Sequence, residues 1–291
     1  MCKCREEKTI YWPIYKWDKV IMRVVLCAMQ KNEHLYINDW VKHYLSIGFD
    51  KIYLYDNDDI DKPYIGDYIN KKYLNRVEII NIRGLKQEKL QHDIYQIFYD
   101  SHNFDWVFFC DIDEFLTGIF NVKIWLEQWC FRNINQIRVK WKLFGDDDLI
   151  KRDMSKPVYN VFTKEVRTSL MRNLKDKGTL ENQGKAFVRG GLKNVAITSP
   201  HFASIKRRDN VIPSMLPSGR PCFSKVTIME NYSHETIFLN HYMTKSLDEF
   251  IKQKLNRNDA VYNTSICLDY YWRINKKTEE KINYLKNLGL M

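Results

Sequence analysis

The sequence predicts an α/β fold in which a mostly parallel central sheet is flanked by helices. Two observations lead to this prediction. Apolar runs of strand length alternate with segments of helical periodicity along the first half of the chain, as in repeated βαβ units. The runs at residues 20–29 and 106–110 are apolar almost throughout, which is typical of strands covered on both faces. Ligands of such sheets bind beyond the carboxyl ends of the strands, so the residues after each strand are candidates for a site.

The first unit starts with the strand at 20–29 and continues with a helix at 33–47, for which Asn32 is the expected N-cap and Gly48 the stop. A second strand at 51–55 ends in a polar turn. The expected elements that follow are a helix at 64–74, a strand at 77–82, a helix at 86–100 with Leu90, Ile94, Ile97 and Phe98 on its inner face, and the strand at 106–110.

The pattern becomes less regular after Glu114. We expect a helix at 121–130 and a strand at 136–144, whereas 150–185 is too polar to assign. The expected remainder comprises short strands and turns at 186–203, a long loop at 207–221, a strand at 237–242, a helix that starts at Ser246, and a Lys-rich helix capped by Thr278 that stops near Gly289. The organisation predicted is a lead-in at 1–19, one domain at 20–259 and a basic helical tail at 260–291.

Composition limits the partners. The 291 residues carry 46 Lys and Arg against 36 Asp and Glu, a net charge of +10, which suits a nucleotide, a nucleic acid or a lipid headgroup. Seven irregularly spaced cysteines indicate a reducing compartment and no disulfide framework. We see no secretory signal and no membrane-spanning run. The expected location is therefore the cytoplasm, or the inner face of the membrane as a peripheral protein.

An acidic cluster follows the strand at 106–110. Asp111 and Asp113 are two residues apart, so their side chains project to the same side of an extended chain and could converge on a hard cation such as Mg²⁺ or Mn²⁺. The alternative is a solvated acidic turn after a core strand.

Several blocks together resemble a known family. They are Lys31-Asn32-Glu33, Tyr55-Asp56-Asn57, Asp111-Ile112-Asp113-Glu114-Phe115, Trp141 with Phe144-Gly145, and His241-Tyr242 followed by Thr244-Lys245-Ser246, Glu249-Phe250 and Lys254. Their order and spacing, over about residues 24–259, resemble the family 92-type glycosyltransferases and their bacterial family 2-like relatives.

The resemblance implies a GT-A, Rossmann-like fold and transfer of a hexosyl group from a nucleotide-sugar, foremost a UDP-sugar. The acceptor would be a saccharide or a lipid-linked saccharide in the synthesis of cell-surface polysaccharide. It also implies that Asp111, Asp113 and His241 bind Mn²⁺ or Mg²⁺, which neutralises the diphosphate that leaves. Lys31, Asn32, Glu33 and Asp56 would lie near the base and ribose, Asp111 on the metal or the ribose, and Lys245 on a phosphate oxygen.

A reaction that inverts the anomeric centre also needs a carboxylate base for the acceptor hydroxyl. Asp146 is the candidate, with Asp147, Asp148, Glu165 and Asp248 as alternatives. A retaining reaction needs no such base. Arg189 and His201 could line the pocket.

Two other functions compete with this interpretation. Asp111 could be the nucleophile of a metal-dependent, haloacid dehalogenase-type phosphatase, but Phe115 stands where that motif has Thr or Val, and several elements precede the strand. A nucleic-acid-binding protein would suit the charge, but no motif for it is present and the lysines are scattered. The basic tail, with Lys276, Lys277, Lys281 and Lys286, could contact anionic lipid.

Overall fold

The computed structural model describes residues 22–167, 182–205, 210–222, 229, 235–255, 257 and 265–291. The predicted lead-in at 1–19 and the predicted boundary at 259/260 lie outside these residues. The described strands form a main sheet of eleven strands and a separate sheet of three, the latter in the order β11-β10-β9. The main sheet follows the order β13-β12-β6-β8-β4-β1-β2-β3, with β5, β7 and β14 beside this path.

Parallel pairing dominates the half of the main sheet that the first part of the chain builds. This half contains β1 (Val24–Gln30), β2 (Lys51–Asp56), β3 (Val77–Asn81) and β4 (Trp106–Phe109), all mutually parallel. β8 (Gly184–Arg189) runs antiparallel to both β4 and β6 (Gln136–Phe144), so β6 has the same direction as β4. The predicted fold class, a mostly parallel sheet flanked by helices, is confirmed.

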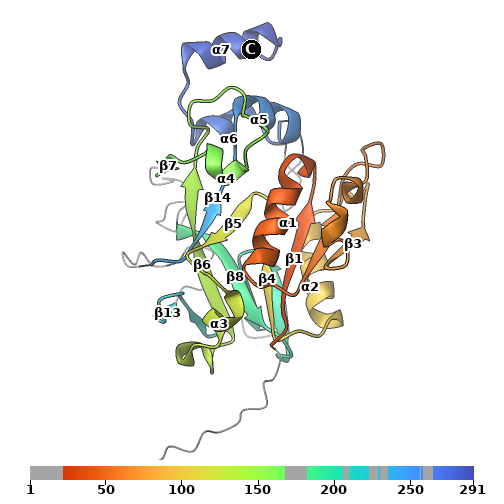
Figure 1. The fold of residues 1–291 in the computed structure, drawn as a ribbon, viewed down its shortest axis with the longest axis vertical. Helices are drawn as coiled ribbons and strands as arrows, with labels where there is room; N and C mark the ends of the chain where they lie inside the picture. The colour runs from red at the N-terminus through yellow and green to blue at the C-terminus, as the bar shows by residue number, and fades with distance from the viewer. Residues whose placement is uncertain are drawn as a thin grey trace, which may run out of the picture.

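Helices cover both faces of this sheet (Figure 1). Residues of α1 (Ile37–Ser46) pack with alternate β1 side chains such as Leu26, whereas residues of α2 (Leu90–Ser101) pack with the intervening ones such as Cys27. Successive side chains of a strand point to opposite faces of the sheet, so the sheet has one hydrophobic core on each face. The predicted inner face of α2 is wrong at Ile97, which is 63% exposed, because Tyr95 and Phe98 occupy the buried stripe.

Several predicted boundaries need correction. Asn32 does not cap a helix, and its φ is +58°. A 3₁₀ turn at His34–Tyr36 precedes α1, and the N-cap residue of α1 is Tyr36, whose side chain makes no capping hydrogen bond. Gly48, with φ +101°, ends the helix as predicted. The predicted helix at 64–74 consists of two 3₁₀ turns, Ile65–Asp67 and Lys71–Tyr73.

The longest strand of the second half that the sequence did not indicate is β5 (Glu114–Thr117), which pairs with β14 (Phe238–His241). Part of the predicted loop at 207–221 is outside the described residues, and the rest is loop that contains very short strands. The remaining elements are α3 (Val122–Leu126), a 3₁₀ turn at Trp129–Phe131, α4 (Val158–Val161), β7 (Glu165–Val166), β9 (Val195–Ser199), β10 (Phe202–Ile205), β11 (Asn210–Val211), β12 (Ser214–Met215) and β13 (Pro221–Cys222).

Three helices form the C-terminal end, α5 (Leu247–Gln253), α6 (Leu268–Trp272) and α7 (Glu279–Asn287), and Figure 1 shows α7 at one extreme of the molecule beyond the other two. The predicted caps are present: Ser246 and Glu249 form a capping box on α5, and Thr278 accepts from a backbone N–H of α7. None of the helices in the described ranges is long and apolar enough to cross a membrane.

Candidate functional site

A cavity of about 490 Å³ opens beyond the carboxyl ends of β1, β2 and β4. This is the edge at which the sequence predicts a site. Among the described residues, its lining includes six basic and four acidic side chains, a surplus of two positive charges with the histidines neutral. These are Lys31, Lys86, Lys185, Lys254, Arg257 and Arg273 against Glu33, Asp59, Asp111 and Asp113.

The turn from Asp111 to Glu114 is anchored to α1 and to itself. Trp40 donates from its indole nitrogen to the carbonyl of Asp111 at 3.1 Å, and the hydroxyl of Tyr44 donates to the carbonyl of Glu114 at 3.1 Å. Within the turn, the carboxylate of Glu114 accepts the backbone N–H of Asp111 at 2.9 Å. The apolar face of α1 thus fixes the backbone that presents the two aspartates.

Glu114 itself faces away from the cavity lining into the protein. It is fully buried, and its Oε1 accepts from the indole nitrogen of Trp141 at 2.6 Å. Burial raises the pKa of Glu114 to about 8, against the opposing effect of Lys185. The sequence leaves Glu114 unassigned, with a bond to the backbone or to an arginine as the options. In the structure it bonds to the backbone and so holds the turn in place.

Asp111 pairs with a lysine from the next strand. Phe187 on β8 pairs with Phe108 on β4, and the two strands are antiparallel. Lys185, two residues before Phe187, therefore lies level with the end of β4, where its ammonium reaches Asp111. Its Nζ is 2.7 Å from Asp111 Oδ2, while Asp111 Oδ1 accepts from the amide of Gln91 at 3.0 Å. Burial alone would raise the pKa of Asp111, but Lys185 outweighs it and the net shift is downward.

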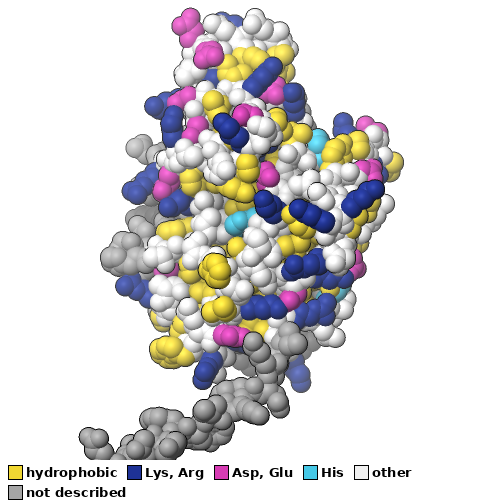
Figure 2. Space-filling view, viewed as in Figure 1, with side chains coloured by type: hydrophobic (Ala, Val, Ile, Leu, Met, Phe, Trp, Pro, Cys, Tyr) yellow, Lys and Arg dark blue, Asp and Glu magenta, His cyan; other side chains and the backbone are white. Residues whose placement is uncertain are grey.

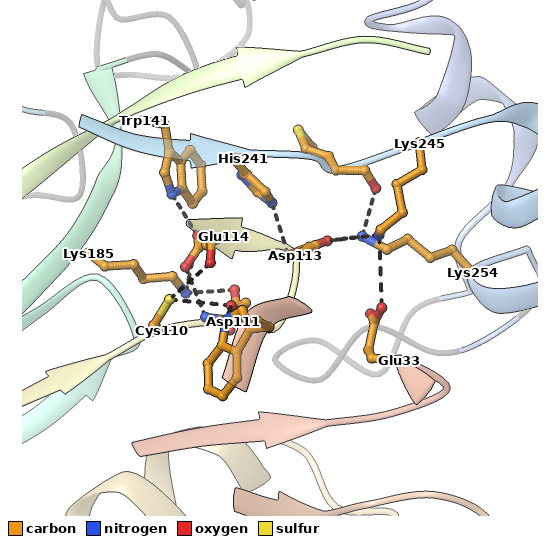
Figure 3. Close-up of polar contacts among 12 residues, drawn as sticks. Glu33, Cys110, Asp111, Asp113, Glu114, Trp141, Lys185, His241, Lys245 and Lys254 are labelled. Atoms are coloured by element: carbon orange, nitrogen blue, oxygen red, sulfur yellow. Dashed lines mark hydrogen bonds and ion pairs between the residues drawn. The ribbon is translucent and has the colours of Figure 1, made fainter. Parts of the chain in front are cut away.

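Asp113 is surrounded by three nitrogen groups (Figure 3). Lys254 Nζ lies 2.5 Å from Asp113 Oδ2 and Lys245 Nζ lies 3.7 Å from the same oxygen, whereas His241 Nε2 is 3.4 Å from Oδ1. Burial would raise the pKa of Asp113, but Lys254, His241 and Lys245 together lower it far below its ordinary value. Asp113 is therefore an anion matched by fixed cations.

His241 arrives through sheet pairing. It is opposite Glu114 in the β14–β5 ladder and next to Leu143 in the β14–β6 ladder. Its ring packs 4.5 Å from that of Trp141, and burial lowers its pKa despite Asp113, so it is neutral at pH 7. Its Nδ1 is buried and has no hydrogen-bond partner among the described residues.

The loop after β1 is held by the polar turn after β2. The side-chain amide of Gln30 donates to Asp56 and, at 2.9 Å, to Asp58, whose other oxygen accepts the backbone N–H of Asn32 at 2.6 Å. These bonds keep Asn32 at its positive φ. The sequence of the turn, with three aspartates, thus positions the loop that lines the cavity.

The structure brings most of the predicted site residues together. Lys31, Asn32, Glu33, Asp111, Asp113 and His241 line the cavity. Lys245 lies behind them, with its Nζ 3.8 Å from Glu33 Oε2. Asp56 lies beneath the loop and does not line the cavity.

Asp146 lies elsewhere. Its buried carboxylate accepts from the hydroxyl of Tyr271 and pairs with Lys281 of α7 at 2.5 Å, and it is not among the residues that line the cavity. The alternative acids are also outside the lining, and each has a partner of its own. Asp147 accepts from Thr163 and Lys164, and Asp148 lies near Lys164. Glu165 lies near Lys142, and Asp248 pairs with Lys252.

Of the two further candidates, only His201 lines the cavity. Its Nδ1 lies 2.8 Å from the carbonyl of Gly184, and burial lowers its pKa to about 3. Arg189 instead donates to the carbonyls of Phe131 and Ile134 and stacks on Trp106.

Sequence reasoning missed the cations of Lys185, Arg257 and Arg273 and gave Lys254 no role. A signal for Lys254 exists: it lies seven residues after Leu247 and four after Phe250, on the apolar stripe of α5. Lys185 carries no such signal, because a lysine in a strand normally faces solvent. Arg273 belongs to the predicted tail, which contributes to the cavity together with Tyr270 and Ile274.

The predicted ligands of a divalent cation have other partners. Each of the four carboxylate oxygens of Asp111 and Asp113 faces a nitrogen group of another side chain, namely Gln91, Lys185, His241 or Lys254. No three His, Cys, Asp or Glu side chains in the described part of the chain form a group that could hold a metal ion. In this arrangement the residues do not fit a bound metal.

Basic side chains do not gather into a stripe on the face seen in Figure 2, where acidic and apolar side chains lie between them. This distribution does not favour the nucleic-acid-binding alternative, whose electrostatic footprint is a basic patch or stripe.

No family model and no curated protein matches the sequence. Among solved structures, the chain is similar to residues 1–349 of S. aureus TarS, with 12% identity, a TM-score of 0.33, and coverage of 58% of this chain and 47% of that chain. The same protein in complex with UDP-GlcNAc gives a TM-score of 0.34 at 12% identity, covering 58% and 45%. A putative glucose-1-phosphate thymidylyltransferase from Bacillus anthracis gives 0.28 at 12% identity, covering 58% and 69%.

The match thus spans about half the length of the TarS chains, and its TM-scores assign no family to this protein. The predicted membership of family 92 is not confirmed by any of these comparisons.

Proposed function

We propose that this protein is a glycosyltransferase that binds a nucleotide-sugar in the cavity beyond β1, β2 and β4. The observation that carries the proposal is the surplus of two positive charges in the cavity lining, with buried cations at its floor. The diphosphate of a nucleotide-sugar carries two negative charges. A volume of about 490 Å³ lies in the range of sites for ligands of this size.

The chemistry that suits these cations is the departure of a nucleoside diphosphate. The acceptor hydroxyl oxygen forms a bond to the anomeric carbon as the bond from that carbon to the phosphate oxygen breaks, and the bonding pair stays on the diphosphate. Its charge rises from two to three negative, and the hydroxyl proton leaves to solvent. Cations fixed at the cavity floor stabilise this developing charge without reorganisation.

Donor recognition follows from the order of residues around the cavity. Lys31, Asn32 and Glu33 would face the base and ribose, while Lys185 and Lys254 would face the diphosphate. Asp56 would act indirectly, because it holds the loop through Gln30. Asp111 would lie beside the ribose, which is one of the two places that the resemblance implies for it, the other being the metal.

The acceptor would be a saccharide, free or lipid-linked. Trp141 and Tyr270 line the cavity and offer aromatic surface to a sugar ring. We assign no proton transfer to Asp146, since Lys281 and Tyr271 hold its carboxylate. A divalent cation at Asp111, Asp113 and His241 enters no step, because those groups have the partners described above.

Contact with anionic lipid would use fewer lysines than the sequence suggests. Lys281 is buried on Asp146, which leaves Lys276, Lys277 and Lys286 exposed at this end of the molecule. Flotation of the protein with phosphatidylserine vesicles tests this contact. Replacement of the three exposed lysines by Gln is expected to reduce flotation, and an unchanged result would exclude the contact.

A panel of UDP-, GDP- and CDP-sugars tests the function. We expect one of them to raise the melting temperature and to be cleaved slowly to the nucleoside diphosphate and free sugar. Lys252→Met should leave both readouts unchanged, because Lys252 points to solvent, whereas Lys254→Met should diminish both. Release of inorganic phosphate from a phosphomonoester would favour the phosphatase. No response to any nucleotide-sugar would exclude the transferase.

A further inference from the structure

The acidic motif of the cavity is already neutralised by side chains. Asp111 and Asp113 each have one oxygen within 2.7 Å of a lysine ammonium, Lys185 and Lys254 respectively. Both ammonium groups are buried, with side-chain exposures of 1% and 7%. Buried charges that are paired at hydrogen-bond distance stay in place. A cation that enters between the two aspartates would have to displace these ammonium groups or lie against them.

Lys245 adds a third buried cation. Its side chain is 1% exposed, and its Nζ makes no hydrogen bond to any described residue, since Asp113 and Glu33 lie 3.7 and 3.8 Å away. The ammonium lies 4.3 Å from the ring centroid of Tyr36. A buried ammonium without hydrogen bonds is costly unless an anion or another acceptor completes its shell.

The backbone at Lys245 is also strained. Its φ is +55°, a region that a residue with a side chain adopts at a cost. The ammonium of this residue lies between Asp113 and Glu33, which line the cavity (Figure 3). Residues held in such conformations cluster at ligand sites.

The charge of the cavity lining distinguishes a donor that binds without metal from one that binds together with a divalent cation. Among the described residues, the cavity lining has a surplus of two positive charges, not counting Lys245, which lies behind the lining. This surplus equals in size the charge of a metal-free nucleotide-sugar diphosphate. With a bound divalent cation the surplus would be four, and the same diphosphate would leave half of it without a counter-ion. The site as built therefore matches the diphosphate alone.

We propose that the ammonium groups of Lys185, Lys245 and Lys254 take the place of a divalent cation, so that this protein binds and cleaves its donor without metal. This inference rests on the proposed function. Asp111 and Asp113 are then counter-ions that hold the lysines in position. The leaving diphosphate shares Lys185 and Lys254 with them, because these two line the cavity, and Lys245 adds its charge from behind Asp113. The developing negative charge is neutralised by ammonium groups that need no exchange with solvent.

Calorimetric titration of the full chain tests this proposal, with UDP, GDP, CDP and inorganic pyrophosphate as probes. The protein is stripped with EDTA and titrated in EDTA, and then titrated with Mg²⁺ or Mn²⁺ in its place. We expect a nucleoside diphosphate to bind in EDTA with an affinity within about threefold of that with metal. Cleavage of the matching nucleotide-sugar should also persist in EDTA.

Variants distinguish metal-free from metal-dependent binding, because the two mechanisms predict opposite effects of Asp113→Asn on the affinity for a nucleoside diphosphate. Asp113→Asn keeps an oxygen for Lys254 but removes a negative charge that competes with phosphate, so binding in EDTA should become tighter, by up to about threefold. Lys254→Met should weaken binding at least about tenfold, and Lys252→Met on the same helix should not change it. Should Lys254→Met fail to fold, Asp113→Asn and the wild type in EDTA decide the question.

Binding that appears only with Mg²⁺ or Mn²⁺ and is lost in Asp113→Asn would overturn the inference and leave the proposed function intact. Binding of no nucleoside diphosphate under either condition would overturn both.

Discussion

Lys254 donates from its ammonium to Asp113 Oδ2 at 2.5 Å and to the carbonyl of Met243 at 2.7 Å. Both side chains of the pair are nearly buried, with exposures of 7% and 5%. Lys254 lies at the end of α5, and Asp113 follows the central strand β4, so the contact joins the C-terminal helices to the sheet. The same ammonium lines the cavity. One lysine thus connects the stability of the fold to the charge of the site.

Lys254→Met is expected to lower the free energy of unfolding by about 2–4 kcal/mol, because it leaves Asp113 buried without its nearest cation. This loss is smaller than that expected for a fully unpaired buried charge, because Lys245 and His241 remain near Asp113. Urea unfolding measures the loss. The control is Lys252→Met, whose exposed ammonium pairs with Asp248, and which should change stability by less than about 1 kcal/mol. Equal losses in the two variants would contradict the pairing.

Asp146 and Lys281 should behave as a structural pair. Their charged atoms are 2.5 Å apart and buried, and the pair ties α7 to the end of β6. We expect a double-mutant cycle of Asp146→Asn and Lys281→Met to give a coupling of about 2 kcal/mol. Nucleoside diphosphate binding by Asp146→Asn should equal that of the wild type. Additive effects, or a loss of binding in Asp146→Asn, would place this aspartate in the site after all.

Glu114 should make stability depend on pH. Burial raises its pKa to about 8, so the folded protein keeps a proton that the unfolded chain releases near its ordinary pKa of 4.5. Between these values the unfolded state binds fewer protons, and the free energy of unfolding falls as pH rises.

Glu114→Gln cannot titrate, and it is the reference for this effect. We expect the wild type to lose stability relative to Glu114→Gln between pH 5 and pH 8 by an amount on the order of a few kcal/mol. Urea unfolding at both pH values measures it. Parallel curves for the two proteins would show that Glu114 is ionised throughout.

A substitution at Gly184 tests the register of β6 and β8, which places Lys185 beside Asp111. A Cβ at Gly184 would lie 1.8 Å from the carbonyl oxygen of Val139 on β6, so Gly184→Ala must separate the two strands. We expect a loss of more than about 3 kcal/mol in the free energy of unfolding. Gly191→Ala is the control, because its φ is +70° but no heavy atom lies within 4 Å, and it should cost only about 1 kcal/mol. A mild effect at Gly184 would refute this register.

The parallel half of the sheet could be predicted because its strands are apolar on both faces. The predicted bounds of β6 agree with the structure, and those of β1, β2 and β4 agree to within a few residues. The backbone of Asn32 and the exposure of Ile97 could not be predicted, for different reasons. Asp58 holds the backbone of Asn32, and aromatic residues compete with Ile97 for the inner face of α2.

The sequence predicted the acids of the site together with Lys31, His241 and Lys245, but not the ion pairs that the acids form. Asp111 and Asp113 stand out in the sequence because they follow a buried strand. Lys185 does not, because only the pairing of β8 with β4 brings it to the same edge. Asp146 looked available after β6, but the partner that occupies it lies 135 residues further on, in α7. Contacts of this range leave no local signal in the sequence.

The most direct measurement is a crystal structure of the protein with the nucleotide-sugar identified by the panel, grown with Mn²⁺ present. The account predicts the diphosphate in the cavity, with oxygens at hydrogen-bond distance, about 3 Å, from the ammonium groups of Lys185 and Lys254 and no ion between Asp111 and Asp113. A Mn²⁺ ion that bridges the two aspartates and the diphosphate, with the lysines turned away, would contradict it.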